Sequence, residues 1–142
     1  MPKFSLKKTV SIPRKIVFST LSNYEEYQKI LPQHFPSIRI RSVRENTAVV
    51  EEHMLLGSVE FVMMVKHVSE EPVLHDVYVI GGDAKGSHFR QQFIETSKGT
   101  KIIAEVNLKL NGKMKITTLF CKINFQDAYS KVLDDFVKVC NS

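Results

Sequence analysis

The sequence has no apolar segment long enough to cross a membrane. Its longest uninterrupted apolar run, Phe61 to Val65, has five residues and is flanked by Glu60 and Lys66, whereas a membrane-spanning helix needs about 18 apolar residues. The opening residues Met-Pro-Lys-Phe-Ser also lack the apolar stretch of a secretory signal peptide. These two absences predict a soluble protein of the cytoplasm.

Cysteines are equally scarce, because Cys121 and Cys140 are the only two. Both fall on one predicted helix, and their separation in sequence corresponds to about 28 Å at 1.5 Å per residue. A disulfide requires Cα atoms within about 7 Å of each other. We therefore expect two reduced, buried thiols that do not pair with each other.

Motifs for metal, cofactor or nucleophilic chemistry are missing as well. The five histidines are scattered, and neither the histidine nor the cysteine spacing is that of a metal site. No Gly-x-Ser-x-Gly motif occurs. The glycine-rich stretch Gly81–Gly86 matches neither the Walker A motif nor the dinucleotide fingerprint, so it is interpreted as a hairpin loop. The sequence predicts no metal and no cofactor.

What is present is the composition of a globular protein. The 142 residues are 43% hydrophobic and 25% charged, which predicts a single domain over residues 1–142 with a sizeable core. The net charge of +5 permits an anionic partner without requiring one.

The first third of the chain predicts one strand and two short helices. Apolar and polar residues alternate from Lys3 to Ile12, as in a half-buried strand, and Lys8 interrupts the apolar face. Pro13 suits the first turn of a helix. A second short helix is expected over 24–31, capped by Asn23 and ended by Pro32.

Five or six strands are expected between Ser37 and Asn111. The best-specified hairpin places a two-residue turn at Lys98-Gly99. This register pairs Phe93 with Ala104, Gln91 with Val106, and Phe89 with Leu108 on the inner face.

From Gly112 to Ser142 the apolar period changes from two to about 3.6, which predicts one long helix. Its apolar stripe consists of Met114, Cys121, Phe125, Ala128, Val132, Phe136 and Val139. This stripe has to be buried against the sheet, so the fold class is α+β.

This order of elements resembles the START-like, Bet v 1-like superfamily of polyketide cyclases/dehydrases and lipid transporters. The resemblance is carried by Val10-Ser-Ile-Pro-Arg-Lys-Ile-Val-Phe18, Tyr24-Glu-Glu-Tyr27, Ile30-Leu-Pro32 and Phe125-Gln-Asp-Ala-Tyr129, and it is greatest to Coq10-like members. It implies a helix-grip fold, in which a curved antiparallel sheet wraps around a long C-terminal helix and two short helices follow the first strand.

The resemblance also implies a pocket between the sheet and the long helix. A curved sheet and a rigid helix cannot touch everywhere, and an apolar, aromatic lining with two polar groups suits a hydrophobic small molecule. The expected function is therefore non-catalytic binding of a quinone, isoprenoid, lipid or polyketide-like compound. The candidate ligand-binding residues are Phe61, Met63, Val65, Phe89, Gln91, Phe93, Phe125, Tyr129 and Val132.

Two alternatives stay open. A cyclase or dehydratase needs an inward acid or base, for which Lys8 and Asp76 are candidates, with His75 taking the role if that strand has the opposite register. Some Coq10-like relatives act on the ribosome, and a basic outer surface for RNA would form if the relevant strands were neighbours. That surface would consist of Lys3, Lys7, Arg39, Arg41 and Arg44.

Overall fold

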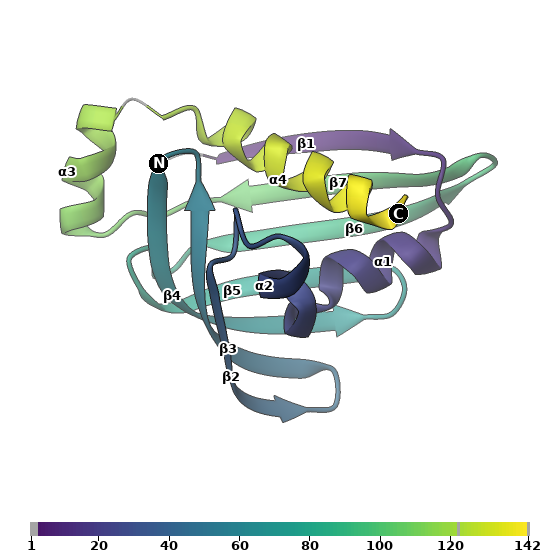
Figure 1. The fold of residues 1–142 in the computed structure, drawn as a ribbon, viewed down its shortest axis with the longest axis horizontal. Helices are drawn as coiled ribbons and strands as arrows, with labels where there is room; N and C mark the ends of the chain where they lie inside the picture. Colours follow the sequence, from purple (N-terminus) through teal and green to yellow (C-terminus); the bar gives the residue numbers. More distant parts are fainter. Residues whose placement is uncertain (1–2, 122, 142) are drawn as a thin grey trace.

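The computed structural model describes residues 3–121 and 123–141, and its main element is a seven-stranded antiparallel sheet (Figure 1). The strands lie in the order β1-β7-β6-β5-β4-β3-β2, so the first two strands of the chain form opposite edges. Their bounds are β1 (Lys3–Val10), β2 (Ser37–Arg44), β3 (Thr47–Leu56), β4 (Val59–Glu70), β5 (Leu74–Gly82), β6 (His88–Thr96) and β7 (Gly99–Asn107).

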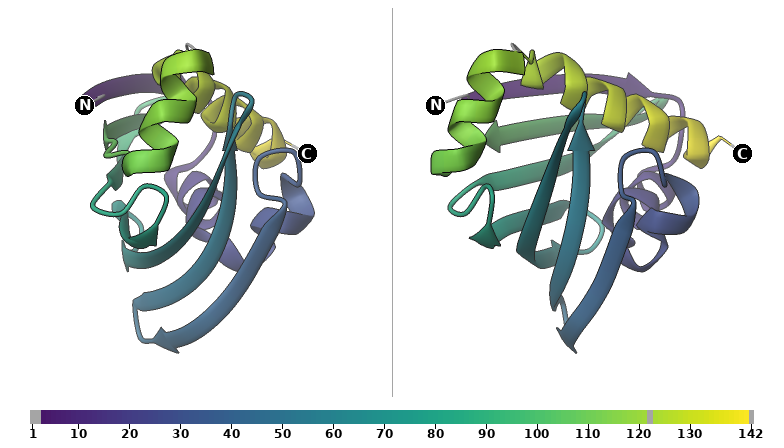
Figure 2. Two further views of the ribbon diagram at one scale, coloured as in Figure 1. Left: turned by 90° about the vertical axis from the view of Figure 1, so that its left-hand side faces the viewer. Right: turned by 60° about the vertical axis from the view of Figure 1, so that its left-hand side comes forward.

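Some of the helices connect the edge strands β1 and β2, and the others follow β7. The helices are α1 (Arg14–Ser22), the 3-10 turn η1 (Tyr24–Glu26), α2 (Tyr27–Ile30), α3 (Gly112–Cys121) and α4 (Phe125–Cys140). Helix α4 crosses the concave side of the sheet and contacts β1, β3 and α1 (Figures 1 and 2). The predicted helix-grip architecture is confirmed.

Strict alternation of burial assigns the inner face of the sheet. Along β3, for example, Ala48, Val50, Glu52, Met54 and Leu56 are buried while the residues between them are partly exposed. Because successive side chains of a strand point to opposite faces, all five lie on the inner face of the sheet. One of these five positions is occupied by a carboxylate.

A bulge between β4 and β5 contributes to the curvature of the sheet. The register shifts between Met64 and Val65, and Gly82 at the end of β5 adopts a positive φ of 93°. A Cβ on Gly82 would lie 2.2 Å from the carbonyl oxygen of Val62. The side chain of Asp83 accepts a hydrogen bond from the Val62 amide at 2.9 Å. A bulge of this kind bends the strand and increases its twist.

The C-terminal helix differs from the expectation, because it is two helices rather than one. Asn124 caps the second of them, since its side-chain oxygen accepts a hydrogen bond from the Asp127 amide at 3.1 Å. The consecutive β-branched residues Ile116, Thr117 and Thr118 also lower the helix propensity before the break. The apolar period alone carries no information about this interruption.

The β6–β7 hairpin keeps its predicted inner face but not its predicted register. Thr96 pairs with Gly99, so the turn lies at Ser97-Lys98, and Gln91 pairs with Ala104. The other two inner pairs are Phe93–Ile102 and Phe89–Val106. The expected register was wrong by two residues. A shift by two leaves every side chain on the same face, which explains why the inner face was still correct.

The strand order also separates the basic side chains that were considered as one outer surface. Lys3 and Lys7 lie on β1, whereas Arg39, Arg41 and Arg44 lie on β2 at the opposite edge. Arg41 is paired with Glu51 of the neighbouring strand at 3.2 Å. The condition that these strands be neighbours is therefore not met.

Among the described helices, none is both long and apolar enough to span a bilayer.

Replacing Gly82 by Ala should lower the free energy of unfolding by about 2 kcal/mol or more, because both the positive φ and the Val62 carbonyl oppose a Cβ. Gly81→Ala is the matched control, since its Cβ would meet only Met64 Cβ at 3.4 Å. Urea denaturation of the two variants measures the difference. Equal losses would contradict this account of the bulge.

Candidate functional site

A small cavity lies between the concave face of the sheet and helix α4. Its volume is about 30 Å³, which is room for about one water molecule. Its apolar walls are Tyr27, Phe35, Met54, Met63, Val77, Phe89, Val132 and Phe136.

The polar groups of this cavity form one continuous hydrogen-bonded chain. His67 Nε2 lies 3.0 Å from Glu52 Oε1, and His67 Nδ1 lies 2.9 Å from His75 Nε2. His75 Nδ1 lies 2.8 Å from Gln91 Oε1. Gln91 Nε2 donates to the Tyr129 hydroxyl at 2.9 Å. We call these five residues the Glu52–Tyr129 chain; all of them are buried.

Four adjacent strands and one helix each supply one residue of the chain. Glu52, His67, His75 and Gln91 occupy inward positions of β3, β4, β5 and β6. His75 and Gln91 are direct cross-strand partners, whereas His67 pairs with Val77 and reaches His75 diagonally. Tyr129 completes the chain from α4. The sheet therefore arranges the chain transverse to its strands, and α4 closes it.

Burial fixes the protonation of two members of the chain. Desolvation lowers the pKa of His75 to about 3, assisted by the neighbouring His67, so the ring is neutral at ordinary pH. Burial also raises the pKa of Tyr129 to about 12, against the opposing hydrogen bond from Gln91. His75 and Tyr129 therefore act as neutral donors and acceptors.

Aromatic rings enclose the His67 imidazole. Tyr24 stacks on it with ring centroids 4.9 Å apart, His75 stacks at 5.1 Å, and Tyr27 approaches edge-on at 6.0 Å. Burying a carboxylate and two imidazoles brings desolvation costs that an apolar core of the same shape avoids. Convergent, perturbed titratable groups at an apolar cavity are typical of functional sites.

All nine residues expected to bind ligand are buried in the core. Five of them also line the cavity, namely Met63, Phe89, Gln91, Tyr129 and Val132. The other four, Phe61, Val65, Phe93 and Phe125, lie in the core but do not line the cavity. The Phe61 and Phe125 rings pack against each other with centroids 6.1 Å apart.

The three residues considered for acid–base chemistry lie in three different places. Lys8 is on the inner face but at its edge, where it contacts Ser130 at 2.9 Å and Asp134 at 2.7 Å. His75 faces the cavity, as the opposite strand register implies.

Asp76 points away from the cavity, so the expectation that it faces inward is not met. Its carboxylate accepts hydrogen bonds from His88 at 2.7 Å and Arg90 at 3.0 Å on the outer face. Burial opposes ionisation of Asp76, but these hydrogen bonds outweigh it and lower the pKa of the carboxyl. Asp76 is therefore part of an outer ion cluster.

Glu52 and His67 were missed by the sequence reasoning. The missed signal is that each residue interrupts an alternating apolar face. On the inner face Glu52 lies between Val50 and Met54, and His67 comes next after Val65.

Within the described residues, no cluster of three or more histidine, cysteine or acidic side chains could hold a metal ion.

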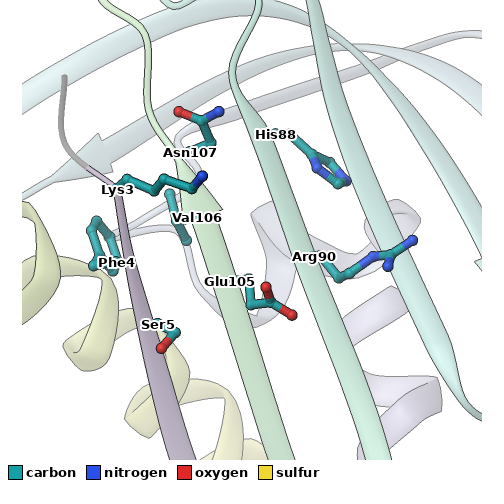
Figure 3. Close-up of a pocket in the computed structure, with 8 residues that line it drawn as sticks. All are labelled: Lys3, Phe4, Ser5, His88, Arg90, Glu105, Val106 and Asn107. Atoms are coloured by element: carbon teal, nitrogen blue, oxygen red, sulfur yellow. The ribbon is translucent and has the colours of Figure 1, made fainter.

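A larger hollow of about 580 Å³ lies on the outer face of β1, β6 and β7 (Figure 3). It is open to solvent, and the His88 and Arg90 side chains that line it are already hydrogen-bonded to Asp76. Its polar lining residues are Lys3, Ser5, His88, Arg90, Glu105 and Asn107. The inner cavity is the better candidate site because its polar groups are buried and convergent.

No known family model and no curated protein matches this sequence. Similar solved structures do exist. The Zhui aromatase/cyclase from a Streptomyces species superimposes with a TM-score of 0.80 over 99% of this chain and 93% of that chain, at 10% identity. Norcoclaurine synthase from Thalictrum flavum gives a TM-score of 0.71 over 97% of this chain and 85% of that chain, at 12% identity.

Major latex-like protein 151 from Panax ginseng gives a TM-score of 0.72 over 96% of this chain and 93% of that chain, at 9% identity. These neighbours are Bet v 1-like proteins. The chain shares the helix-grip fold of these neighbours, and at these identities the likeness concerns the fold alone.

His75→Gln should make the protein less sensitive to acid. His75 has a pKa of about 3 in the fold and about 6.5 in the unfolded chain. Between these values the unfolded chain binds the extra proton, so stability present above about pH 6.5 is lost as the pH falls. The wild type should lose up to about 1.4 kcal/mol per pH unit more than the variant. Denaturation curves at several pH values test this, and parallel pH profiles would contradict it.

Proposed function

We propose that this chain, as a single domain, binds a small hydrophobic molecule in the cavity between the sheet and α4. The observation that supports this most strongly is the Glu52–Tyr129 chain, a buried set of polar groups that ends at a hydroxyl among apolar walls. An apolar wall supplies affinity, and a few fixed polar groups supply orientation. The ligand class is a quinone, isoprenoid, lipid or polyketide-like compound.

Binding requires the cavity to widen, because sites for small molecules usually occupy about 300–1,000 Å³ and this cavity has about 30 Å³. Met54 and Met63 on its wall are unbranched and have three rotatable bonds each, so they can repack at low cost. The ligand would occupy the volume that becomes free when the Met54 and Met63 side chains change rotamer.

Two comparisons support an aromatic or quinone-like ligand. The neighbouring norcoclaurine synthase has been crystallised with dopamine and hydroxybenzaldehyde, and other neighbours are aromatase/cyclases. The Tyr24-Glu-Glu-Tyr27 and Ile30-Leu-Pro32 stretches favour a closer relation to Coq10-like members, which points to quinones.

Filling the cavity should weaken ligand binding. Val132→Phe places extra volume at the cavity wall, and Val62→Phe places the same volume on the outer face of β4, where Val62 is 48% exposed. We expect affinity for a short-chain ubiquinone or 2-acetonaphthone to fall at least about tenfold, or 1.4 kcal/mol, in Val132→Phe alone. Native mass spectrometry and fluorescence titration measure this. Equal affinities in the two variants, or no binding to wild type, would refute the proposal.

A second candidate is a cyclase or dehydratase. The observation that favours it is the Glu52–His67 pair, which provides an acid–base couple within hydrogen-bond reach of His75. The outer basic surface offers less support for an RNA-binding role, since its residues lie at opposite edges of the sheet.

If the cavity is catalytic, Glu52→Gln should lower kcat for cyclisation of a synthetic poly-β-ketone by about 100-fold or more, because it removes the titratable acid. Substrate binding should change far less, since the amide has the same shape. Single-turnover product analysis by mass spectrometry tests this. Products formed no faster than without protein would leave binding as the function.

A further inference from the structure

The protons of the Glu52–Tyr129 chain can be placed in two ways that satisfy all of its hydrogen bonds. Histidine nitrogens and the two ends of an amide each act as donor or acceptor, but two acceptors cannot share a hydrogen bond. The direction chosen at Gln91 therefore determines the direction of every bond back to Glu52. This inference rests on the proposed binding function, because it concerns the ligand that the same site prefers.

In the first arrangement Gln91 Oε1 faces His75 Nδ1, as in the structure. His75 is neutral, so its one proton is on Nδ1, and its Nε2 accepts from His67 Nδ1–H. The bond between His67 Nε2 and Glu52 Oε1 then contains one more proton, held by the imidazole or by the carboxyl. At the other end Gln91 donates to Tyr129, so the hydroxyl proton of Tyr129 is free to donate to a ligand.

In the second arrangement the Gln91 amide is rotated by half a turn, which leaves its shape unchanged. Its nitrogen donates to His75 Nδ1, and its oxygen accepts from the Tyr129 hydroxyl. His75 then donates from Nε2 to His67, and His67 donates from Nε2 to an ionised Glu52. Every bond is again satisfied, but the chain contains one proton fewer and carries one negative charge.

We propose that the Glu52–Tyr129 chain is a proton-coupled selector of ligand chemistry. When the Glu52–His67 pair holds the additional proton, Tyr129 donates, and the site takes a ligand with a carbonyl or another acceptor oxygen. When that proton leaves, Gln91 rotates, the Tyr129 proton turns to Gln91, and the site no longer donates to the ligand.

The other titratable groups around the chain do not compete for this proton. Tyr24 and Tyr27 face His67 from η1 and α2, and burial raises the pKa of both phenols. Asp76 lies on the far face of β5 and is paired with Arg90 and His88. Among the described groups that face the chain, the Glu52–His67 pair is left to gain and lose the proton.

The tautomer of His75 reports the switch without any ligand. In protein labelled with ¹⁵N at histidine, long-range ¹H–¹⁵N spectra should show His75 protonated at Nδ1 at low pH and at Nε2 at high pH. Above its own pKa of about 3, His75 should stay uncharged, and its change of tautomer should follow a single midpoint at which the chain loses one proton. A single His75 tautomer across the titration, or an imidazolium at His75, would overturn the selector.

Glu52→Gln is the matched variant, since an amide donates or accepts without changing its proton count. We expect the His75 tautomer in this variant to be independent of pH. A tautomer change that persists in the variant with the wild-type midpoint would place the proton elsewhere and overturn the assignment to the Glu52–His67 pair.

Two probes of the same shape test the ligand preference. The carbonyl of 2-acetonaphthone accepts a hydrogen bond, whereas 2-isopropenylnaphthalene has a CH₂ group in place of that oxygen. In wild type the affinity ratio of ketone to alkene should fall by up to about tenfold per pH unit above the midpoint. The ratio should be constant in Glu52→Gln and close to one in Tyr129→Phe.

The outcomes separate this inference from the proposed function. Binding of both probes at a ratio that does not depend on pH would overturn the selector and leave hydrophobic binding intact. Binding of neither probe would overturn the proposed function for bicyclic aromatics and the ligand preference with it, while the histidine spectra would still decide whether the proton switch exists.

Discussion

The packing of α4 on the concave face of the sheet is the constraint on which the rest of the structure depends. A sheet this curved leaves one face that only a helix can cover, and the apolar stripe of α4 provides Phe125, Val132 and Phe136 for that purpose. The bulge between β4 and β5, where the register skips from Gly81 to Val79, supplies curvature from the sheet side. The cavity lies where the sheet and α4 do not touch, so the candidate site is a direct result of the way in which the helix packs on the sheet.

Within that apolar interface the buried polar residues are tolerated because they satisfy one another. A half-satisfied buried network would cost more than an apolar core, and here the bonds run without interruption from a carboxylate on β3 to a phenol on α4. Because every bond in the chain is made, the donor and acceptor roles of each residue depend on those of its neighbours. Strands β3, β4, β5 and β6 each contribute one residue, and four hydrogen bonds connect the carboxyl group at one end of the chain with the phenol at the other.

Much of the fold could be predicted from the sequence, because it depends on local periodicity. The alternation of apolar and polar residues located the strands, and Pro13 located the start of the first helix. The apolar stripe of seven residues located the helical region at the C-terminal end. The break before Asn124 and the two-residue register shift at Ser97-Lys98 were not predictable in this way, since neither changes which face is apolar. Gln91 and Tyr129 were identified as polar groups at the site. Glu52 and His67 are not direct cross-strand partners, since Glu52 pairs with Met63 and His67 with Ala48, so a strand register alone does not predict their contact.

The edge position of β1 has a consequence for how the molecule assembles. Lys3 pairs with Asn107 of β7, and Lys8 contacts Ser130 and Asp134 of α4, so within the described residues the pairing strand and the covering helix of β1 both lie in the last part of the chain. Contacts between such distant segments slow folding, because a long loop has to close before they form. During synthesis the apolar side of β1 therefore stays exposed to solvent until β7 and α4 have been synthesised and have left the ribosome.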